Sequence, residues 1–242
     1  MINGLFSGAA AMDTLSRKQE VISSNLAHAT TSGHRRVQAS VKQPFDADNL
    51  DSTILMGPEI ESYASDFSPG RQVQTGRPLD VSIAGDGFFA FDNSGGTGDS
   101  EYLSRNGRLF REPESNLLVN EEGFPIQGMT GAITIDPTIG DQDVVIAADG
   151  TVSADGNVLG QIRTVTFEDN QTLIPLGVAG FVPGVNSVVS EQPANVQQHQ
   201  HELSNVQPVN ELVALIANNR QYEAVQKATT ALSESLREYI RA

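Results

Sequence analysis

The sequence has no cysteine and no tryptophan, and only 6% of its residues are aromatic. The absence of cysteine excludes disulfide bonds, thiolate nucleophiles and thiolate metal ligands. So few aromatic residues argue against a ligand pocket lined with aromatic rings. With 38% hydrophobic residues over 242 positions, the chain is still long enough for one large domain or two modest domains with cores of their own.

A basic surplus is also missing. The formal net charge is −15, which argues against a general nucleic-acid binder, because such a protein needs a basic face to neutralise phosphates. No stretch approaches the ~20 apolar residues of a membrane-spanning helix. The first twenty residues lack a basic start followed by an unbroken apolar core, so they do not form a Sec-type signal peptide. We therefore expect no membrane insertion, and export, if it occurs, by another route.

The C-terminal stretch from Ser204 to Arg241 carries a long helical pattern. Residues that alternate three and four positions apart form a narrow stripe, which a helix uses to pack lengthwise on another helix. Ser204 and Asn205 are the predicted N-cap residues, and Pro208 lies inside the first turn. Such a helix spans roughly 50 Å at about 1.5 Å per residue, and so needs a long partner. The stripe comprises Leu215, Asn218, Tyr222, Val225, Thr229, Leu232, Leu236 and Tyr239.

The N-terminal stretch has the same alternation and is predicted to be a helix from about Leu5 to Ala27. Breakers from Thr30 to Gly33 end it. The stripe is small and partly polar, so this helix is marginal alone. It is either an ordinary core helix of a globular domain or the partner of the C-terminal helix. Its stripe comprises Leu5, Gly8, Met12, Leu15, Gln19, Ile22, Leu26 and Ala29.

The middle of the chain has the texture of a β-domain. Short apolar runs from Leu79 to about Gly184 are separated by Asp-Gly, Asn-Gly and Glu-Gly dipeptides, which are typical of tight turns. Because the ends are helical and the middle is β, the simplest arrangement is that the two ends meet. We predict an α+β fold in which long N- and C-terminal helices pair as a coiled-coil-like domain with an inserted antiparallel all-β domain. The expected boundaries are 1–36 and 204–242 for the helical domain, 37–77 for an extended connector, 78–184 for the β-domain and 185–203 for a return linker.

Residue constellations for catalysis or metal binding are weak. Gly85 to Ala90 matches G-x-G-x-x-A, but strand-like residues follow where a dinucleotide site needs a helix, so a tight hairpin turn is the better interpretation. His199 and His201 provide only half a metal site, and a solvated linker is favoured. No nucleophile elbow or paired carboxylates stand out. We expect no enzyme activity, catalytic residue, metal or cofactor.

Specific sequence motifs indicate a protein family, which the helical periodicity alone does not. ISSNLAHATTSGHRR (22–36) and LSNVQPVNELVALIANNRQYE (203–223) resemble the paired terminal signatures of bacterial flagellar rod and hook proteins. TGRPLDVSIAGDGFFAF (75–91), LSRNGRL (103–109) and NLLVNEEGFPIQG (116–128) resemble the β-domain of the same family. TGRPLDV and the short return linker are most similar to the FlgF-type proximal rod members, with the distal rod protein FlgG a close second. His28 and His34 stand where the family has Asn and an aromatic residue, and Asn219 where it has Gln.

The resemblance implies a structural subunit of the flagellar basal-body rod. It implies terminal helices that pair inside the rod, export by the flagellar type III apparatus without a cleaved signal peptide, and helical polymerisation in the periplasmic space. The implied partners are other axial proteins, copies of itself and the export apparatus. Helix-packing and assembly residues are expected at Leu5, Met12, Leu15, Ile22, Asn25, Leu26, Asn205, Val206, Leu215, Arg220, Tyr222, Val225, Leu232 and Leu236.

Two alternatives stay open at this stage. The first is a distal-rod or hook-type protein, which would share the fold at another level of the flagellar axis. The second is a periplasmic β-domain that binds a carbohydrate or a peptide. Stabilisation by such a ligand would distinguish the second alternative.

Overall fold

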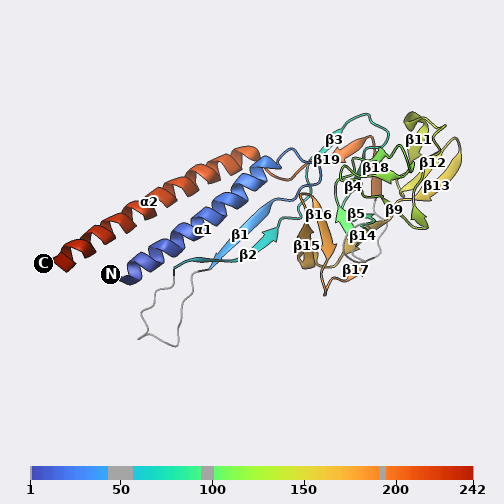
Figure 1. The fold of residues 1–242 in the computed structure, drawn as a ribbon. Helices are drawn as coiled ribbons and strands as arrows, with labels where there is room; N and C mark the ends of the chain where they lie inside the picture. The colour runs from blue at the N-terminus through green and yellow to red at the C-terminus, as the bar shows by residue number, and fades with distance from the viewer. Residues whose placement is uncertain (1, 43–56, 94–100, 191–194, 242) are drawn as a thin grey trace. The chain divides into compact units, whose positions relative to one another are not determined.

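A computed structural model of the protein describes residues 2–42, 57–93, 101–190 and 195–241. The chain divides into two compact units (Figure 1). The helical unit contains Met1–Ala27, Arg36–Asp66 and Val206–Ala242, and the β unit contains His28–Arg35 and Phe67–Asn205. Each unit is therefore assembled from segments that are far apart in the sequence.

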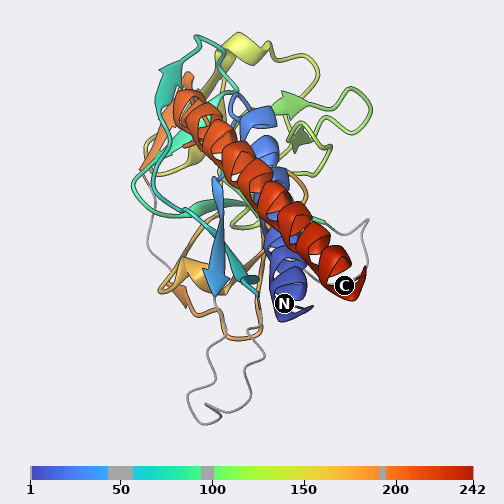
Figure 2. The ribbon, with the colours of Figure 1, turned by 90° about the vertical axis from the view of Figure 1, so that its left-hand side faces the viewer.

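The helical unit consists of two helices and one hairpin. Helix α1 (Ile2–Ala27) and helix α2 (Pro208–Arg241) run antiparallel and lie side by side, as both ribbon views show (Figures 1 and 2). Strands β1 (Val37–Lys42) and β2 (Glu59–Ser65) form an antiparallel pair whose register shifts between Ser40 and Val41. Both strands contact α1. The N-terminal helix thus packs against α2 and also against a β ribbon.

The boundaries of the helices follow from local chemistry. Helix α1 ends before a turn that closes with Gly33, whose φ of +72° suits a residue without a Cβ. Helix α2 begins at Pro208, where the missing N–H is harmless, and its first helical hydrogen bond runs from Glu211 N to Gln207 O. The helix therefore starts four residues later than the predicted cap at Ser204.

The α+β class and the mainly β middle agree with the structure, but the predicted coiled-coil-like pairing is wrong. A coiled coil buries a repeating apolar seam on each helix. In α2 the buried residues are Glu211 and Asn218, both polar, while seam residues such as Leu215 and Val225 remain half exposed. Helix α1 also packs against the β1–β2 pair, so α2 is not its single partner.

The β unit is built from short antiparallel strands. The largest sheet has six strands in the order β15-β16-β6-β5-β14-β17, and one sheet has three strands in the order β11-β12-β13. The two-stranded pairs are β9-β10, β4-β18, β3-β19 and β7-β8. The strands are β3 (Gln72–Gln74), β4 (Val81–Ala84), β5 (Phe88–Phe91), β6 (Tyr102–Ser104), β7 (Phe110–Arg111), β8 (Leu118–Val119), β9 (Gln127–Gly128), β10 (Gly131–Ala132), β11 (Val144–Ile146), β12 (Thr151–Ala154), β13 (Asn157–Gln161), β14 (Thr164–Phe167), β15 (Leu173–Leu176), β16 (Gly180–Pro183), β17 (Val189–Ser190), β18 (Asn195–Gln198) and β19 (Gln200–Glu202). Two 3-10 turns, Asp141–Asp143 and Asn170–Thr172, precede β11 and β15.

Strand β5 joins the two apolar clusters of this unit. Successive side chains of a strand point to opposite faces of the sheet. Phe88 and Ala90 accordingly pack in one cluster with Phe167 and Phe181, while Phe89 and Phe91 pack in the other cluster. All four residues of the strand are buried. Because both faces are covered, the FFAF sequence is continuously apolar and does not alternate.

The connectors contain more structure than their sequences indicate. The segment 37–77, predicted as an extended connector, contains β1, β2 and β3, and the return linker 185–203 contains β17, β18 and β19. The acidic middle of the connector (46–51) and the first four residues of EQPANVQQHQ lie outside the described residues. Gly85 and Gly87 turn the chain between β4 and β5, which belong to different sheets, so the hairpin predicted there is wrong. Neither α-helix, as far as the structure describes it, has the length and hydropathy needed to span a bilayer.

Candidate assembly site

The facing surfaces of α1 and α2 are the candidate assembly site of the helical unit. On α2, the side chains of the predicted stripe from Leu215 to Leu236 are buried or half-buried, and Tyr239 at its end is exposed. On α1, the stripe from Leu5 to Leu26 is likewise half-buried, and Ile22 is buried. The two stripes therefore face inward within this unit, but their apolar area is only partly removed from water.

The structure places the predicted assembly residues in several environments. Asn25 and Val206 are buried in the helical unit, and Arg220 is exposed on α2. Asn205 belongs to the β unit, where its Nδ2 donates hydrogen bonds to the carbonyl and the hydroxyl oxygen of Ser68, both at 3.1 Å. The half-buried members are Leu5, Met12, Leu15 and Leu26 on α1 and Leu215, Tyr222, Val225, Leu232 and Leu236 on α2.

Small residues on α1 permit close approach on two sides. A Cβ at Gly8 would lie 2.5 Å from Thr229 Oγ1 of α2, and a Cβ at Gly4 would lie 3.3 Å from a Leu232 methyl carbon. On another side, a Cβ at Gly57 would lie 2.5 Å from Ala10 Cβ. The abundance of Gly and Ala in the first helix thus reflects two close contacts, and a larger side chain would separate the elements.

Buried polar groups then fix which surfaces meet. Asn218 Nδ2 donates to Leu15 O at 2.9 Å, which ties α2 to α1. Asn25, 1% exposed, makes two hydrogen bonds with the backbone of Val37: Val37 N donates to Oδ1 at 2.9 Å, and Nδ2 donates to Val37 O at 2.8 Å. The asparagine amide thus imitates a neighbouring strand at the start of β1. Both residues lay in motifs that the sequence singled out.

An ion pair that no local sequence pattern indicates lies at the start of α2. Arg36 Nε lies 2.5 Å from Glu211 Oε1, and the Glu211 side chain is 1% exposed. The Arg36 side chain keeps contact with water, at 34% exposure. Glu211 lies in the first turn of α2, where the positive end of the helix dipole also favours a carboxylate. The pair joins residues 175 positions apart.

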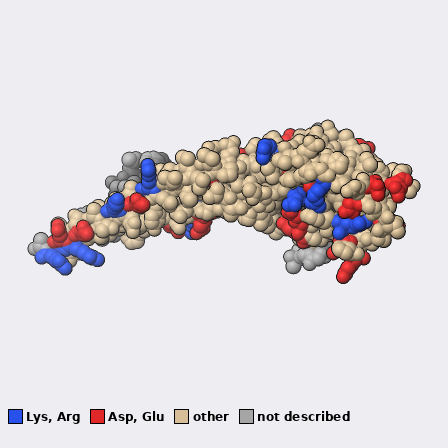
Figure 3. All heavy atoms as spheres, turned by 90° about the horizontal axis from the view of Figure 1, so that it is seen from above, with Lys and Arg blue, Asp and Glu red and all other residues tan. Residues whose placement is uncertain are grey.

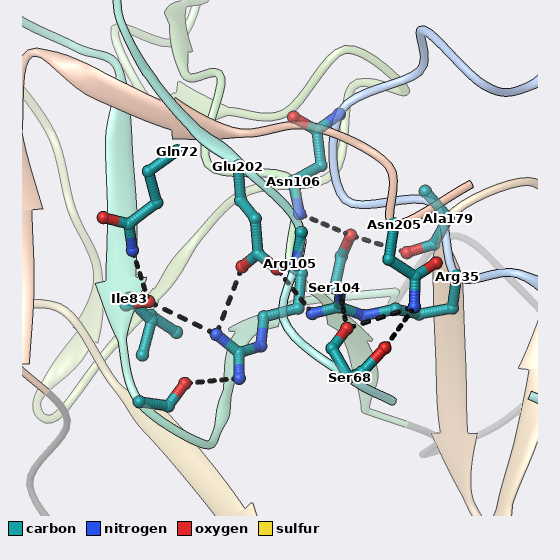
Figure 4. Close-up of polar contacts among 12 residues, drawn as sticks. Arg35, Ser68, Gln72, Ile83, Ser104, Arg105, Asn106, Ala179, Glu202 and Asn205 are labelled. Atoms are coloured by element: carbon teal, nitrogen blue, oxygen red, sulfur yellow. Dashed lines mark hydrogen bonds and ion pairs between the residues drawn. The ribbon is translucent and has the colours of Figure 1, made fainter. Parts of the chain in front are cut away.

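The β unit has its own buried charged junction, centred on Glu202 of β19 (Figure 4). Its Oε1 accepts a hydrogen bond from Gly70 N at 2.7 Å, and its Oε2 lies 3.2 Å from Arg105 Nη1. Arg35 Nη2 lies 2.8 Å from Oε1. The N–H of Arg35 is not aligned with that oxygen, so we count this contact as charge pairing and not as a hydrogen bond. One carboxylate thus compensates two buried guanidinium groups.

The same junction collects backbone carbonyls and amides from distant segments (Figure 4). Arg105 donates to Gly85 O at 2.6 Å, and Arg35 Nη1 donates to Ser68 O at 2.9 Å. Gly33 N donates to Glu202 O at 2.9 Å. Burial lowers the pKa of the Arg105 guanidinium, and the nearby Glu202 charge opposes that shift. The junction fastens the segments through which the chain enters and leaves the β unit.

The candidate metal ligands of the sequence, His199 and His201, lie in the β unit. In the part of the chain that the structure describes, no three His, Cys, Asp or Glu side chains group as a metal site would require. His199 is exposed, while His201 Nδ1 faces the buried Asp80 carboxylate at 3.8 Å. Burial is the main cause that lowers the pKa of His201, and Asp80 opposes it. The two histidines thus occupy different environments and form no shared site.

Comparison with known proteins decides the family. The C-terminal domain of flagellar basal-body rod FlgEFG proteins matches residues 197–242, and the D1 domain of flagellar hook proteins FlgE/F/G matches residues 82–154. The flagellar basal-body rod protein FlgF of Caulobacter vibrioides is 34% identical over 97% of this chain and 96% of its own length. This chain belongs to the family of flagellar basal-body rod proteins. FlgF of Salmonella typhimurium is 28% identical over 97% of the chain and 96% of its own length, and FlgG of Bacillus subtilis is 27% identical over 99% and 98%.

The rod-protein family therefore accounts for motifs from both units. The chain is of the FlgF type, since FlgF of Caulobacter vibrioides matches nearly its full length at 34% identity and FlgG of Bacillus subtilis does so at 27%. The matched C-terminal domain contains Glu202, Glu211 and Asn218, three of the buried polar residues described above. These positions are the internal joints of the two units, whereas the exposed side chains of α2 remain available to other molecules.

Proposed function

We propose that this chain is a non-enzymatic structural subunit of the flagellar basal-body rod, and that its helical unit packs against copies of itself and against other axial proteins. The observation that carries the proposal is the incomplete burial of the helical unit. Its inward stripes are only half-buried, and α2 also exposes apolar residues on its outer side. A unit of this kind gains stability when neighbouring subunits cover it.

The proposed assembly residues are those of the inward stripes together with Asn25, Asn205, Val206 and Arg220. The half-buried stripe residues become more deeply buried when a neighbouring subunit packs against the helix pair. Asn25 acts inside the unit, since its two hydrogen bonds hold the start of β1 in place, and Val206 is buried two residues before α2. Arg220, exposed on α2, is free to reach a neighbouring carboxylate.

The proposed route to the rod is the flagellar type III export apparatus, without a cleaved signal peptide, with assembly in the periplasmic space. Two features support it. The helical unit buries little apolar surface, so it opens at a low free-energy cost, and no disulfide constrains the unfolded chain. The names of the relatives place those proteins in the flagellar basal body.

Removing Val225–Ala242 from the chain in its own bacterium tests the proposal. The truncation deletes the half of α2 that lies against the N-terminal part of α1, as the Gly8–Thr229 contact shows. We expect motility to be lost, and basal bodies purified from these cells to lack a complete rod. A matched control is Val158→Ser on β13, which changes an exposed residue of the β unit and should leave motility intact. Unchanged motility after the truncation would rule the proposal out.

Proteolysis of the purified chain provides a second test. If the helical unit is completed only by neighbours, a protease should remove the terminal helices and leave a resistant fragment of about residues 67–205. Mass spectrometry of the fragments identifies the cuts. A chain that resists cleavage from end to end would mean that the helical unit is complete in the monomer, contrary to the proposal.

A further inference from the structure

Two histidines of the β unit lie next to each other, and we call them the histidine pair. The rings of His28 and His34 have centroids 5.2 Å apart, and their planes are tilted by 42°. Both residues belong to the segment His28–Arg35, which follows α1 in the chain. They stand where the rod-protein motif has Asn and an aromatic residue, so the family motif does not account for the pair.

A tight turn brings the two rings together. On an uninterrupted helix, residues six positions apart point about 120° away from each other. Here Thr31 N donates to His28 O at 3.1 Å, and His34 N donates to Thr31 O at 3.4 Å, so the chain turns sharply between the two histidines. Gly33, with a φ of +72°, supplies the left-handed conformation in this turn. The backbone therefore holds the histidine pair in place without a ligand. Charged side chains that Figure 3 shows along the molecule are not needed for this.

The His34 ring has the hydrogen bonding of a metal ligand. Its Nδ1 donates to Val178 O at 2.7 Å, in the turn between β15 and β16, and this bond fixes the ring proton on Nδ1. Nε2 then carries the lone pair, and it is buried without a hydrogen-bond partner among the described residues. A histidine that binds a metal commonly donates its other ring N–H to a backbone carbonyl in this way. Nε2 of His34 is therefore oriented and unoccupied by any side chain or backbone donor described here.

His28 supplies the second ligand at a suitable distance. It is half-buried, and its Nδ1 lies 3.5 Å from Thr31 Oγ1. Two imidazole nitrogens that bind one ion at about 2.0–2.1 Å in a tetrahedral arrangement place their ring centroids roughly 5 Å apart. The centroid distance of 5.2 Å in the histidine pair agrees with that geometry. In the described ranges of the chain no third His, Cys, Asp or Glu side chain joins the pair, so water completes the coordination and the ion exchanges readily.

We propose that the histidine pair is an exchangeable binding site for a divalent transition-metal ion of the class that imidazole prefers, such as Cu²⁺ or Zn²⁺. Imidazole selects these ions over Mg²⁺ and Ca²⁺, which prefer oxygen ligands. The neighbouring cation, Arg35, is compensated, because Glu202 Oε1 lies 2.8 Å from its Nη2. Burial lowers the pKa of His34, which keeps its ring neutral near pH 7, as metal binding requires. A bound ion would tie the turn after α1 to itself, and the site does not depend on the proposed function.

Copper binding to the purified full-length chain tests the site. Cu²⁺ is the probe, because it binds nitrogen ligands more tightly than the other divalent first-row ions do. The chain, without an affinity tag and stripped with EDTA, is dialysed against graded Cu²⁺ near neutral pH, and the bound copper is measured. His28→Asn and His34→Phe should each bind copper about tenfold more weakly or worse, since even the outer-shell partners of a metal contribute roughly 10–100-fold. His199→Asn, which removes an exposed histidine outside the pair, is the matched control and should bind like the unsubstituted chain.

Pulsed EPR of the bound Cu²⁺ adds a direct count of ligands and should show two imidazoles in the unsubstituted chain and in His199→Asn. Circular dichroism checks that each variant is folded; if His34→Phe is not, the half-buried position His28→Asn decides the result alone. Equal copper binding by the unsubstituted chain and His28→Asn would overturn the proposal and leave the two rings as a packing contact, as would a loss of binding in His199→Asn. Motility after removal of Val225–Ala242 tests the rod function separately, so either proposal can fail while the other stands.

Discussion

The two units bury different kinds of side chain. In the β unit, two apolar clusters meet at β5, and buried charges are confined to joints such as Glu202 and Asp80. In the helical unit, the fully buried apolar side chains among the described residues are Ile22 and Val206, while Thr14, Asn25, Glu211 and Asn218 are buried polar residues. Apolar burial is the main source of folding free energy. The β unit is therefore equipped to fold alone, whereas the helical unit is specified by polar contacts and needs further cover.

Glu202 should produce the largest effect, and it contrasts directly with Glu211. In Glu202→Gln the buried guanidinium groups of Arg35 and Arg105 lose the carboxylate that pairs with both, so we expect a loss of about 3–5 kcal/mol in the stability of the β unit. In Glu211→Gln the loss should be smaller, because Arg36 reaches water. Hydrogen exchange followed by mass spectrometry reports each unit separately. Equal losses in the two variants would mean that the exposure of the partner does not control the penalty.

Gly8→Val should weaken the helical unit without touching the β unit. A Cβ at Gly8 already meets Thr229 Oγ1 at 2.5 Å, so the valine side chain forces α1 and α2 apart. We expect a loss of about 1–3 kcal/mol, seen as faster hydrogen exchange along both helices. Ala9→Val introduces the same side chain at an exposed neighbouring position and serves as the control. Equal exchange in the two variants would show that the close approach at Gly8 is unimportant.

The contrast also explains how much of the fold the sequence predicts. Periodicity located both helices and β5, because each is long or strongly apolar in its own right. It did not find β1 and β2, whose residues are mostly exposed and whose pairing joins segments that are not adjacent in the sequence. It also suggested a coiled coil, because a three-four alternation reports which side of a helix faces inward and not how deeply that side is buried.

The buried polar contacts of the two units were harder to predict than the helix stripes. Asn218 stood out because it interrupts an apolar stripe, and Asn25 stood out because it lies in a motif that resembles the rod and hook proteins. Glu202 pairs with Arg105 across 97 positions, and Glu211 with Arg36 across 175. In a chain with 30 acidic residues, nothing local distinguishes a carboxylate that will be buried from one that will be solvated. Only the three-dimensional fold selects these two.

Asn218→Leu tests what the buried Asn218 contributes to the stability of the helical unit and to motility. Asn218 donates to Leu15 O, but its Oδ1 is buried without a partner among the described residues. Replacing it by leucine removes that unpaired oxygen and should stabilise the helix pair by about 1 kcal/mol. The single register set by the asparagine is then lost, so motility should fall although stability rises. Asn219→Leu, at the exposed adjacent position, should change neither quantity. Loss of stability in Asn218→Leu would show that the hydrogen bond to Leu15 outweighs the unpaired oxygen.

The smallest expected effect is a pH dependence of the β unit that comes from His34. This side chain is buried, its Nδ1 donates to Val178 O at 2.7 Å, and its ring centroid lies 5.2 Å from that of His28. Burial, followed by the charges of His28 and Arg35, lowers the pKa of His34 below its ordinary value of 6.5, while the hydrogen bond to Val178 opposes the shift. As the pH falls below 6.5, the unfolded chain therefore takes up the proton first, so stability is highest above that pH and decreases below it.

Thermal melting of the β unit between pH 7 and pH 5 measures this dependence. His34→Phe keeps an aromatic ring but cannot take up a proton, so the midpoint should fall less on acidification than in the unsubstituted chain. Part of the dependence should remain, because burial also lowers the pKa of His201. His199→Asn is the matched control: His199 is exposed, and its φ of +63° is one that asparagine tolerates. If His34→Phe and His199→Asn show the same decrease, the pKa of His34 does not differ between the folded and the unfolded chain, and its buried ring contributes packing alone.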